Sequence, residues 1–324
     1  MLIFWQKNKF IIVFLLHKPH NKGKVTKGGK NMTYRIGVDS GGTHVTAIAY
    51  GEKCISLSKS VSGPGNIFIN AEQAVRHITL AIKKAAISDQ KCEKILVGIA
   101  GLESAQAPDK YLEEVKANVA AICTNISFIS DAQLALLNGL KGRDGFLTIA
   151  GTGSIVYGKQ KRKYLRAGGW GYLLDDIGSG YKITQEATTK FLQYYDSGKK
   201  CSYQDVIFEY FQVQSVRELI SKYYLIDRSQ IAGCSVKLAQ AAKKGDEQVI
   251  AVFKHQGKLL AEEIIRLVHR YSTSKIEYRL ALSGSVLVKN SIIQEELKKI
   301  VLKELPQMKI YISKQNNSMA VNYI

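Results

Sequence analysis

The chain has 324 residues, of which 46% are hydrophobic and 23% charged. This length allows two domains with sizeable cores, and the composition is ordinary for a soluble globular protein. The five cysteines are dispersed and include no Cys-x-x-Cys pair, which argues against a disulfide framework or structural zinc and for reduced thiols in a cytoplasm. The net charge of +19 comes from basic residues that are scattered instead of clustered with aromatic residues, which disfavours nucleic-acid binding. Attraction of an anionic substrate explains the charge as well.

The first 31 residues differ from the rest of the chain, because they contain seven lysines and no acidic residue. Their apolar run, residues 10–16, is too short to span a bilayer, and no small-residue cleavage site follows it. Residues 27–32 can be encoded by a purine-rich stretch of the kind that binds ribosomes, directly before a start codon for Met32. We therefore expect residues 1–31 to be a disordered extension or a misassigned start. A basic tail that touches a membrane is the alternative.

Two apolar, β-branched runs, residues 36–40 and 45–50, flank the sequence Gly41-Gly42-Thr43-His44. This pattern predicts two strands joined by a tight turn. Glycines let a ligand approach the backbone, and successive N–H groups in such a turn can bind an anion. Asp39 at the edge of the turn suggests a hydrated metal ion. The alternative is a hairpin turn without a ligand.

The next part of the chain alternates strands and helices, which predicts an α/β domain with a mixed sheet over residues 32–142. The predicted strands are 54–61, 94–101 and 126–131, and the predicted helices are 71–86, 108–121 and 132–140. Asp131 lies where the last of these strands passes into a helix. It is either the helix N-cap or a carboxylate at the carboxyl end of a strand, where open α/β sheets bind ligands.

The same pattern then repeats, because strands 145–150 and 155–158 flank a second small-residue turn, Gly151-Thr152-Gly153-Ser154, and a third strand follows at 164–167. Two such turns on duplicated domains suggest two phosphate-binding loops. The second domain is predicted to cover residues 143–324. Its further elements are helices over 183–270, a strand at 280–286 that runs into a glycine turn, a helix at 291–303 and a strand at 308–312.

Residues 168–181 contain five glycines, Trp170, Asp175 and Asp176. An aromatic ring with flanking carboxylates suits a polyhydroxylated ligand, which stacks on the ring and hydrogen-bonds at its edges. A glycine-rich linker without a binding role is the alternative.

Together, and in this order, these motifs resemble the N-acetylglucosamine kinases, which belong with the BadF/BadG/BcrA/BcrD-type ATPases in the acetate/sugar kinase–Hsp70–actin superfamily. The resemblance extends from Tyr34 almost to the C-terminus. It implies duplicated ribonuclease H-like (actin-like ATPase) α/β domains, with mixed β-sheets flanked by helices and a cleft between the domains. It also implies a kinase that uses ATP and Mg²⁺ to phosphorylate the 6-hydroxyl of N-acetylglucosamine.

The resemblance also implies roles for individual residues. Asp131 takes the place of the general base, and Asp39 would hold Mg²⁺ through water. The phosphate-binding positions are Gly41, Gly42, Thr43, Gly151, Thr152, Gly153 and Ser154. The adenosine motif falls on Gly284 and Ser285, and the sugar-binding positions are Asn66, Thr152, Gly169, Trp170 and Asp176.

One departure leaves the sugar open: where relatives often read Gly-Asp-Glu-Gly-Ser, this chain has Asp175-Asp176-Ile177-Gly178-Ser179. N-acetylmuramic acid and glucosamine are therefore alternative acceptors. A dehydratase-activating ATPase is disfavoured because no cysteine lies in a loop suited to an iron–sulfur cluster. A sugar-sensing regulator is the non-enzymatic alternative. We expect a cytoplasmic enzyme with ATP and an amino sugar as partners, and neither nucleic acid nor a membrane; a homodimer is left open.

Overall fold

The computed structural model describes residues 4–6, 9–11, 32–161, 163–271 and 277–324. The chain divides into two compact units, residues 1–32 and 33–324. In the first unit, β1 (Phe4–Gln6) pairs with β2 (Lys9–Ile11) as an antiparallel hairpin in which Trp5 lies opposite Phe10. The expectation for residues 1–31 concerns mostly residues outside the described part, so it stays a prediction.

The second unit begins with a five-stranded mixed sheet of order β5-β4-β3-β6-β7. Neighbours β5, β4 and β3 pair antiparallel, whereas β3, β6 and β7 pair parallel. The elements of this half are β3 (Thr33–Ser40), β4 (Val45–Tyr50), a 3₁₀ turn η1 (Glu52–Cys54), β5 (Ser56–Ser62), α1 (Ala71–Ala85), β6 (Lys91–Ile99), α2 (Asp109–Val119), β7 (Ile126–Ser130) and α3 (Asp131–Leu140).

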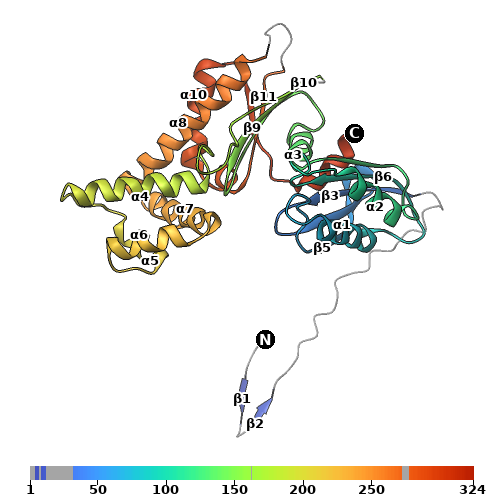
Figure 1. The fold of residues 1–324 in the computed structure, drawn as a ribbon, viewed down its shortest axis with the longest axis horizontal. Helices are drawn as coiled ribbons and strands as arrows, with labels where there is room; N and C mark the ends of the chain where they lie inside the picture. The colour runs from blue at the N-terminus through green and yellow to red at the C-terminus, as the bar shows by residue number, and fades with distance from the viewer. Residues whose placement is uncertain (1–3, 7–8, 12–31, 162, 272–276) are drawn as a thin grey trace. The chain divides into compact units, whose positions relative to one another are not determined.

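Helices cover both faces of this sheet. On one face, α1 and α2 lie side by side (Figure 1) and bury an apolar core with residues such as Ile36 and Ile95. Asn70 caps α1 by accepting a hydrogen bond from the Gln73 amide. On the other face, α3 packs with the C-terminal 3₁₀ helix η3 (Asn317–Tyr323). The predicted periodicity of these segments is confirmed, with ends displaced by a few residues.

A second sheet repeats the topology of the first. Its order is β10-β9-β8-β11-β12, again with two antiparallel pairings followed by two parallel ones. The strands are β8 (Gly145–Ala150), β9 (Ser154–Gln160), β10 (Lys163–Ala167), β11 (Arg279–Ser283) and β12 (Lys309–Ile312). Because hairpin, third strand and two parallel strands recur in the same order, the predicted duplication is confirmed.

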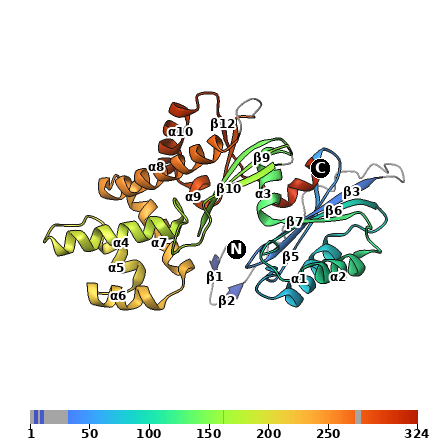
Figure 2. The ribbon, with the colours of Figure 1, turned by 45° about the horizontal axis from the view of Figure 1, so that its top comes forward.

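A group of helices is inserted between β10 and β11, and in Figure 2 α4 lies beside α7, and α8 beside α10. Together with the second sheet these helices form a continuous core that includes Phe146, Phe191 and Phe253. The inserted helices are α4 (Gly180–Asp196), α5 (Gln204–Phe211), α6 (Val216–Leu225), α7 (Arg228–Lys243) and α8 (Glu247–His269). Two further helices, α9 (Ser285–Lys289) and α10 (Ser291–Glu304), connect β11 to β12.

The C-terminal segment returns to the first sheet, which the sequence did not indicate. Ser318 forms a hydrogen bond with the Tyr50 hydroxyl, with 2.8 Å between the two oxygens. A side chain at Gly37 would clash with the Ser318 carbonyl, so β3 needs glycine here for η3 to pack closely. The last segment of the predicted second domain, 143–324, therefore packs on the sheet of the predicted first domain, 32–142. The division into these two domains stays a prediction.

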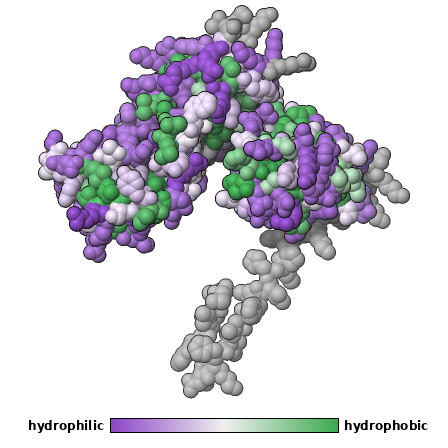
Figure 3. Space-filling model, viewed as in Figure 1, coloured by the Kyte–Doolittle hydropathy of each residue, from purple (hydrophilic) through white to green (hydrophobic). Residues whose placement is uncertain are grey.

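On the visible face, hydrophilic side chains are spread widely and hydrophobic residues form separate patches, one of them over the α4–α6 region (Figure 3). Among the helices that the structure describes, none is both long enough and apolar enough to cross a lipid bilayer.

Candidate functional site

The first glycine turn joins β3 to β4 and is solvent-accessible. The register ends with Ser40 opposite Val45, and the Gly41 amide donates to the His44 carbonyl at 3.0 Å. Gly42 has no positive φ, and a Cβ added to it would meet no described atom within 4 Å. The protein therefore gives no internal reason for glycine at this position. The open space beside the backbone fits the approach of a phosphate group.

Asp39 lies one residue before the end of β3, opposite Thr46. Burial raises the pKa of its carboxyl, and the Asp131 carboxylate raises it further; a hydrogen bond with Asn317 and the charge of His44 act in the opposite direction. A cation would relieve this unfavourable charge, so Asp39 fits the predicted metal position. Within the described ranges, no group of three or more His, Cys, Asp or Glu side chains could hold a metal. Water and phosphate oxygens would have to supply the other ligands.

Asp131 is the first residue of α3 and not its cap. Ser130 is the N-cap: its hydroxyl accepts from the Gln133 amide at 3.3 Å, and the Gln133 side chain accepts from the Ser130 amide. The alternative in which Asp131 merely caps the helix is therefore wrong. Among the described residues, Asp131 Oδ1 accepts a single local hydrogen bond, from the Ala132 amide at 2.9 Å, and the residue is exposed.

The two carboxylates lie at the same edge of the sheet. β3, β6 and β7 run parallel, so their carboxyl ends, which carry Asp39 and Asp131, point the same way. Desolvation by the surrounding protein raises the pKa of Asp131; the Ala132 amide opposes this, and the charge of Glu103 adds to it. A carboxylate with a raised pKa at the carboxyl edge of a parallel strand is a candidate for proton transfer.

The loop that carries Asn66 is attached to the first glycine turn. The Gly65 amide donates to the Gly41 carbonyl at 2.9 Å, and the Ser40 hydroxyl donates to the Gly65 carbonyl at 2.8 Å. Asn66 Oδ1 accepts from the Phe68 amide at 3.0 Å and from the Ile69 amide. Since Oδ1 is engaged, Asn66 would offer a ligand its Nδ2 donor.

The second glycine turn joins β8 to β9 and is tied to other segments. The Gly151 carbonyl accepts from the Gly180 amide at 2.7 Å, at the start of α4. The Ser154 hydroxyl is buried and donates to the Ile177 carbonyl at 2.6 Å. Thr152 is exposed. The turn thus presents Thr152 outward, while the Ser154 hydroxyl binds the segment around Ile177.

Gly284 and Ser285 lie next to this turn. Gly284 has φ +87° and caps α9, and a side chain there would clash with the Ala150 carbonyl. A Cβ added to Gly151 would have Ser285 Oγ as its nearest neighbour, at 3.7 Å. The predicted adenosine motif and the second phosphate loop are therefore adjacent.

The segment that follows β10, residues 168–179, is named the acceptor loop here. Gly168 and Gly169 both have φ +69°, and Gly168 packs against the buried Glu263 carboxylate. Trp170 is 63% exposed, and the Arg166 guanidinium lies 3.9 Å from its ring centroid. The loop therefore holds the indole at the surface with a cation on one face.

Asp176 is buried although it is charged in its ordinary state. It is 4% exposed, has φ +69° and leaves Oδ2 without a hydrogen-bond partner in the described part of the chain. Burial raises its pKa, and the Ser154 amide and Arg228 lower it. A Cβ added to Gly153 would lie 2.9 Å from Asp176 Oδ2. A strained, buried carboxylate with an oxygen that accepts no hydrogen bond is typical of a functional position.

The structure thus joins the predicted residues into three groups: the first turn with Asp39, Asp131 and Asn66; the second turn with Gly284 and Ser285; and the second turn with Asp176. Within the described ranges, no hydrogen bond connects the first turn to the second, or Asp131 to the acceptor loop. One residue of the second sheet, Tyr157 on β9, is close enough to Asp131 to be affected by its charge. Tyr157 lies opposite Arg166, and its pKa is raised to about 12 by burial and by the charges of Glu103 and Asp131.

Sequence reasoning missed Tyr157, Arg166, Glu103, Glu263, Asn317 and Arg228. Pairing the two predicted strands around residue 161 could have placed Tyr157 opposite Arg166. For Glu263 and Arg228 no local signal exists, because both reach the acceptor loop from helices far along the chain.

Comparisons with known proteins agree with the predicted resemblance. The sequence model of the BadF/BadG/BcrA/BcrD ATPase family matches residues 36–321. A Clostridium acetobutylicum protein named N-acetylmuramic acid/N-acetylglucosamine kinase is 29% identical over 298 residues, which cover 89% of this chain and 96% of that protein. N-acetyl-D-glucosamine kinase from Dictyostelium discoideum is 27% identical over 297 residues, covering 85% and 92%.

The fold is also similar to solved structures. A candidate N-acetylglucosamine kinase from Chromobacterium violaceum aligns with a TM-score of 0.66 and 19% identity, over 91% of this chain and 99% of that chain. At this identity the likeness concerns the fold alone. The predicted actin-like fold class is confirmed.

Proposed function

Since the chain belongs to the BadF/BadG/BcrA/BcrD ATPase family, we propose that it is an ATP-dependent kinase that phosphorylates the 6-hydroxyl of N-acetylglucosamine. Two relatives that match most of the chain carry N-acetylglucosamine kinase in their names. The observation that carries the proposal is the position of Asp131. Its carboxylate does not cap α3, because Ser130 does, and its pKa is raised. It lies at the same edge of the sheet as Asp39 and the first glycine turn, residues 41–44.

Phosphoryl transfer depends mainly on positioning and on neutralisation of charge. In this proposal the amides of Gly42 and Thr43 contact phosphate from one side, and residues 151–154 contact it from the other. The Gly41 amide donates to the His44 carbonyl instead, so Gly41 would contribute only close approach of the backbone to the phosphate. Asp39 would hold Mg²⁺ through water, and the ion would neutralise phosphate charge. The adenosine would lie at Gly284 and Ser285, which the structure places beside Gly151.

The acceptor sugar would lie between Asn66 and the acceptor loop. Trp170 would provide an apolar face, and Asp176, Gly169 and Thr152 would provide hydrogen-bonding groups at its edge. Asp176 supports this role because its Oδ2 has no hydrogen-bond donor among the described residues. Since this oxygen is buried, the acceptor loop would have to move for a sugar hydroxyl to reach it.

Asp131 would accept a hydrogen bond from the 6-hydroxyl, orient it toward the phosphorus atom and take its proton late in the transfer. A raised pKa brings the carboxyl closer to neutral pH and improves it as a proton acceptor. Residues around the site must also exclude water, which is a competing acceptor.

We further propose a cytoplasmic location, because ATP is the donor and the cysteines are free thiols. A homodimer stays a prediction that analytical ultracentrifugation checks.

The test is an acceptor screen with purified protein, ATP and Mg²⁺. ADP release is followed with N-acetylglucosamine, N-acetylmuramic acid, glucosamine and no sugar, and NMR identifies the phosphorylated oxygen. We expect N-acetylglucosamine to be phosphorylated at its 6-hydroxyl. ATP hydrolysis that does not depend on any sugar would contradict the proposal and favour an activator-type ATPase.

A further inference from the structure

The buried side chain of Gln256 joins the end of the acceptor loop to two helices. Gln256 lies on α8 and is 5% exposed. Its Oε1 accepts a hydrogen bond from the Gly178 amide at 2.8 Å, and its Nε2 donates to Glu186 Oε2 on α4 at 2.7 Å. Both ends of the amide are therefore engaged inside the protein. The roles proposed for the sugar and ATP do not involve Gln256.

The orientation of the Gln256 amide follows from the charge of Glu186. Burial raises the pKa of Glu186, but hydrogen bonds with Lys190, Gln256 and His255 outweigh it and leave the pKa below its ordinary value. Lys190 Nζ lies 2.8 Å and His255 Nδ1 lies 2.9 Å from Glu186 Oε1. An ionised carboxylate only accepts hydrogen bonds, so it faces the Nε2 of Gln256. The Oε1 is then directed at the Gly178 N–H.

The backbone around Gly178 is also held by a second segment. The Ser154 hydroxyl of the second turn donates to the Ile177 carbonyl at 2.6 Å. Gly178 has φ +78°, and a Cβ added to it would lie 2.8 Å from Leu260 Cδ2, on α8. The two residues directly after Asp176 are therefore fixed by the second turn and by α8. Without Gln256, the Gly178 amide would be buried and lack this acceptor, which is costly.

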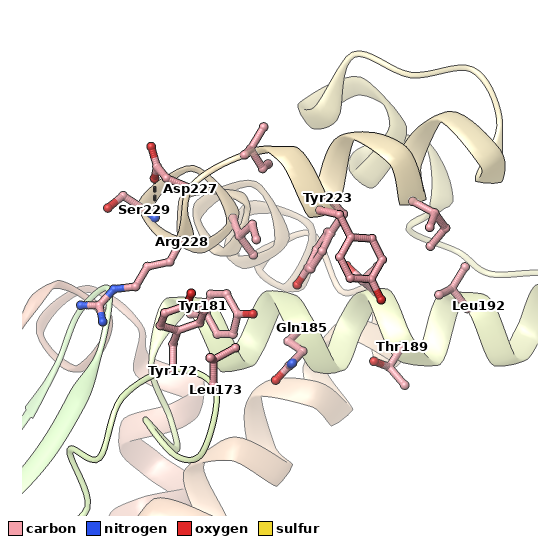
Figure 4. A pocket seen from close by; sticks show the side chains of 15 residues that line it. Tyr172, Leu173, Tyr181, Gln185, Thr189, Leu192, Tyr223, Asp227, Arg228 and Ser229 are labelled. Atoms are coloured by element: carbon pink, nitrogen blue, oxygen red, sulfur yellow. Dashed lines mark hydrogen bonds between the residues drawn. The ribbon is translucent and has the colours of Figure 1, made fainter.

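The preceding part of the acceptor loop, by contrast, has open space beside it. Tyr172 and Leu173 line a cavity of about 760 Å³ whose other walls come from α4, α6 and the start of α7 (Figure 4). Leu173 is 73% exposed and Leu174 is 85% exposed. Because few contacts restrain these residues, the loop can move here to bring Asp176 to a sugar hydroxyl. Gly178, at the held end, would be the fixed point of that movement.

Building on the proposed kinase function, we propose that Gln256 is a positioning residue for the acceptor sugar. By holding the Gly178 amide, it restricts the positions that Asp176 reaches when the loop moves, so less freedom is lost when the sugar binds. Gln256 acts through the loop and does not touch the sugar, because both ends of its amide are engaged.

The test compares two glutamines of α8. Gln256→Met keeps the length of the side chain and removes both hydrogen bonds. Gln248→Met is the matched control, because Gln248 Oε1 also accepts from a backbone amide, that of Ser202 at 2.9 Å. The Ser202 loop contributes no residue to the proposed sugar and ATP sites. For each variant we measure kcat, KM for N-acetylglucosamine and KM for ATP, and urea unfolding records the loss of stability.

We expect Gln256→Met to raise KM for the sugar by about 10- to 100-fold, the effect of leaving a buried amide without its acceptor next to Asp176. KM for ATP and kcat should be nearly unchanged, because the phosphate-binding turns and Asp131 keep their own contacts. Gln248→Met should lose a comparable amount of stability and leave KM for the sugar as it is in the unmodified protein.

Gln256→Glu is the conservative variant, because a carboxyl oxygen can still accept from the Gly178 amide. At about pH 5 the introduced carboxyl and Glu186 share a proton beside Lys190 and His255, and the O–H group replaces the missing amide donor. At about pH 8 the two adjacent carboxylates repel each other. Relative to the unmodified protein, the Kd for the sugar from calorimetry should therefore be nearly restored at the lower pH and rise toward the higher one.

Equal rises of KM for the sugar in the two methionine variants would assign the effect to lost stability and overturn the inference. An unchanged KM for the sugar in Gln256→Met would overturn it as well. Should no sugar be phosphorylated, the kinase proposal fails, and hydrogen exchange followed by mass spectrometry decides whether Gln256 holds the loop. Faster exchange of residues 168–179 in Gln256→Met alone supports that hold, and equal exchange in both variants removes it.

Discussion

The two glycine turns occupy equivalent places in two sheets of the same topology, yet their surroundings differ. In the first turn, a Cβ added to Gly42 would meet nothing within 4 Å. In the second, Gly153 touches Asp176, the Gly151 carbonyl accepts from Gly180, and Ser154 donates to Ile177. The first turn is a surface open to a ligand. The second turn also contacts the acceptor loop through Gly153 and Ser154 and so fixes its position.

This difference shows how a duplicated element can acquire two roles through the segments packed against it. The turns themselves also differ in length, with four residues between Ser40 and Val45 and three between Ala150 and Ser154. Both turns end an antiparallel strand pair, and in each the first amide donates to a carbonyl of the same turn. What differs is the segment packed behind each. The first turn is backed by the short Asn66 loop, whereas the second is backed by the acceptor loop and, behind that, by α8. The first half would therefore supply the proton acceptor, and the second half would hold the sugar.

The largest expected effect is the loss of the proton acceptor in the first half. Asp131→Asn should lower kcat by about 10²- to 10⁴-fold, because the amide cannot take the proton of the hydroxyl. Sugar binding should be nearly unchanged, since the shape of the side chain is kept. Steady-state kinetics and calorimetry check both statements. Glu103→Gln is the control, because it removes the neighbouring charge and leaves Asp131 in place. Near-normal turnover of Asp131→Asn would remove Asp131 from the mechanism.

The second prediction concerns Glu263, an acidic residue of α8 that packs behind the acceptor loop of the second half. Glu263 is buried against Gly168, and burial, with Asp175 and Asp176, raises its pKa to about 7. Since the ordinary value is 4.5, the folded state keeps the proton up to higher pH than the unfolded state. Its free energy of unfolding should therefore fall by on the order of 3 kcal/mol as pH rises from about 4.5 to 7.

The variant Glu263→Gln cannot titrate, so it should lack this loss and become more stable than the unmodified protein above pH 7. Urea unfolding between pH 5 and 8 measures the difference. Glu262→Gln, on the same helix but partly exposed, is the control. Parallel stability curves for the unmodified protein and Glu263→Gln would rule out a buried, titrating Glu263.

The third prediction tests the contact between Gly153 of the second turn and Asp176 of the acceptor loop. Gly153→Ala would bring a methyl group to 2.9 Å from Asp176 Oδ2, and the buried Asp176 has little room to move. We expect a loss of about 1–3 kcal/mol in stability and a rise of about tenfold or more in KM for the sugar. Thermal melts and kinetics measure these effects. Unchanged sugar KM would show that Gly153 does not position Asp176.

The smallest effect on stability is expected for the equivalent change in the first turn. Gly42→Ala should alter the free energy of unfolding by no more than about 0.5 kcal/mol, because a Cβ there would meet no atom of the described residues within 4 Å apart from its chain neighbours. It should still raise KM for ATP by about 10- to 100-fold, since the methyl group would take the space of a phosphate oxygen and cost a charge-assisted hydrogen bond. If ATP binding survives intact, the first turn is a hairpin without a ligand.

Local sequence signals were sufficient for most elements. Strands β3 and β4, helix α1 with its Asn70 cap and the break before α8 at Asp246 follow from alternation, helical periodicity and capping residues. The short helix α9 and the C-terminal η3 were missed. Neither has a periodic apolar face of its own, and each is held by contact with a distant strand.

The sequence by itself determined the duplicated strand order, the two glycine turns and the identity of the candidate carboxylates, because each depends on residues within a few positions of one another. Only the tertiary structure decided what those residues face. Ser130 and not Asp131 caps α3, Ser154 holds Ile177, and Asp176 lies beside Arg228. The last contact joins residues 52 positions apart, and folding, not the local pattern, selects such a neighbour.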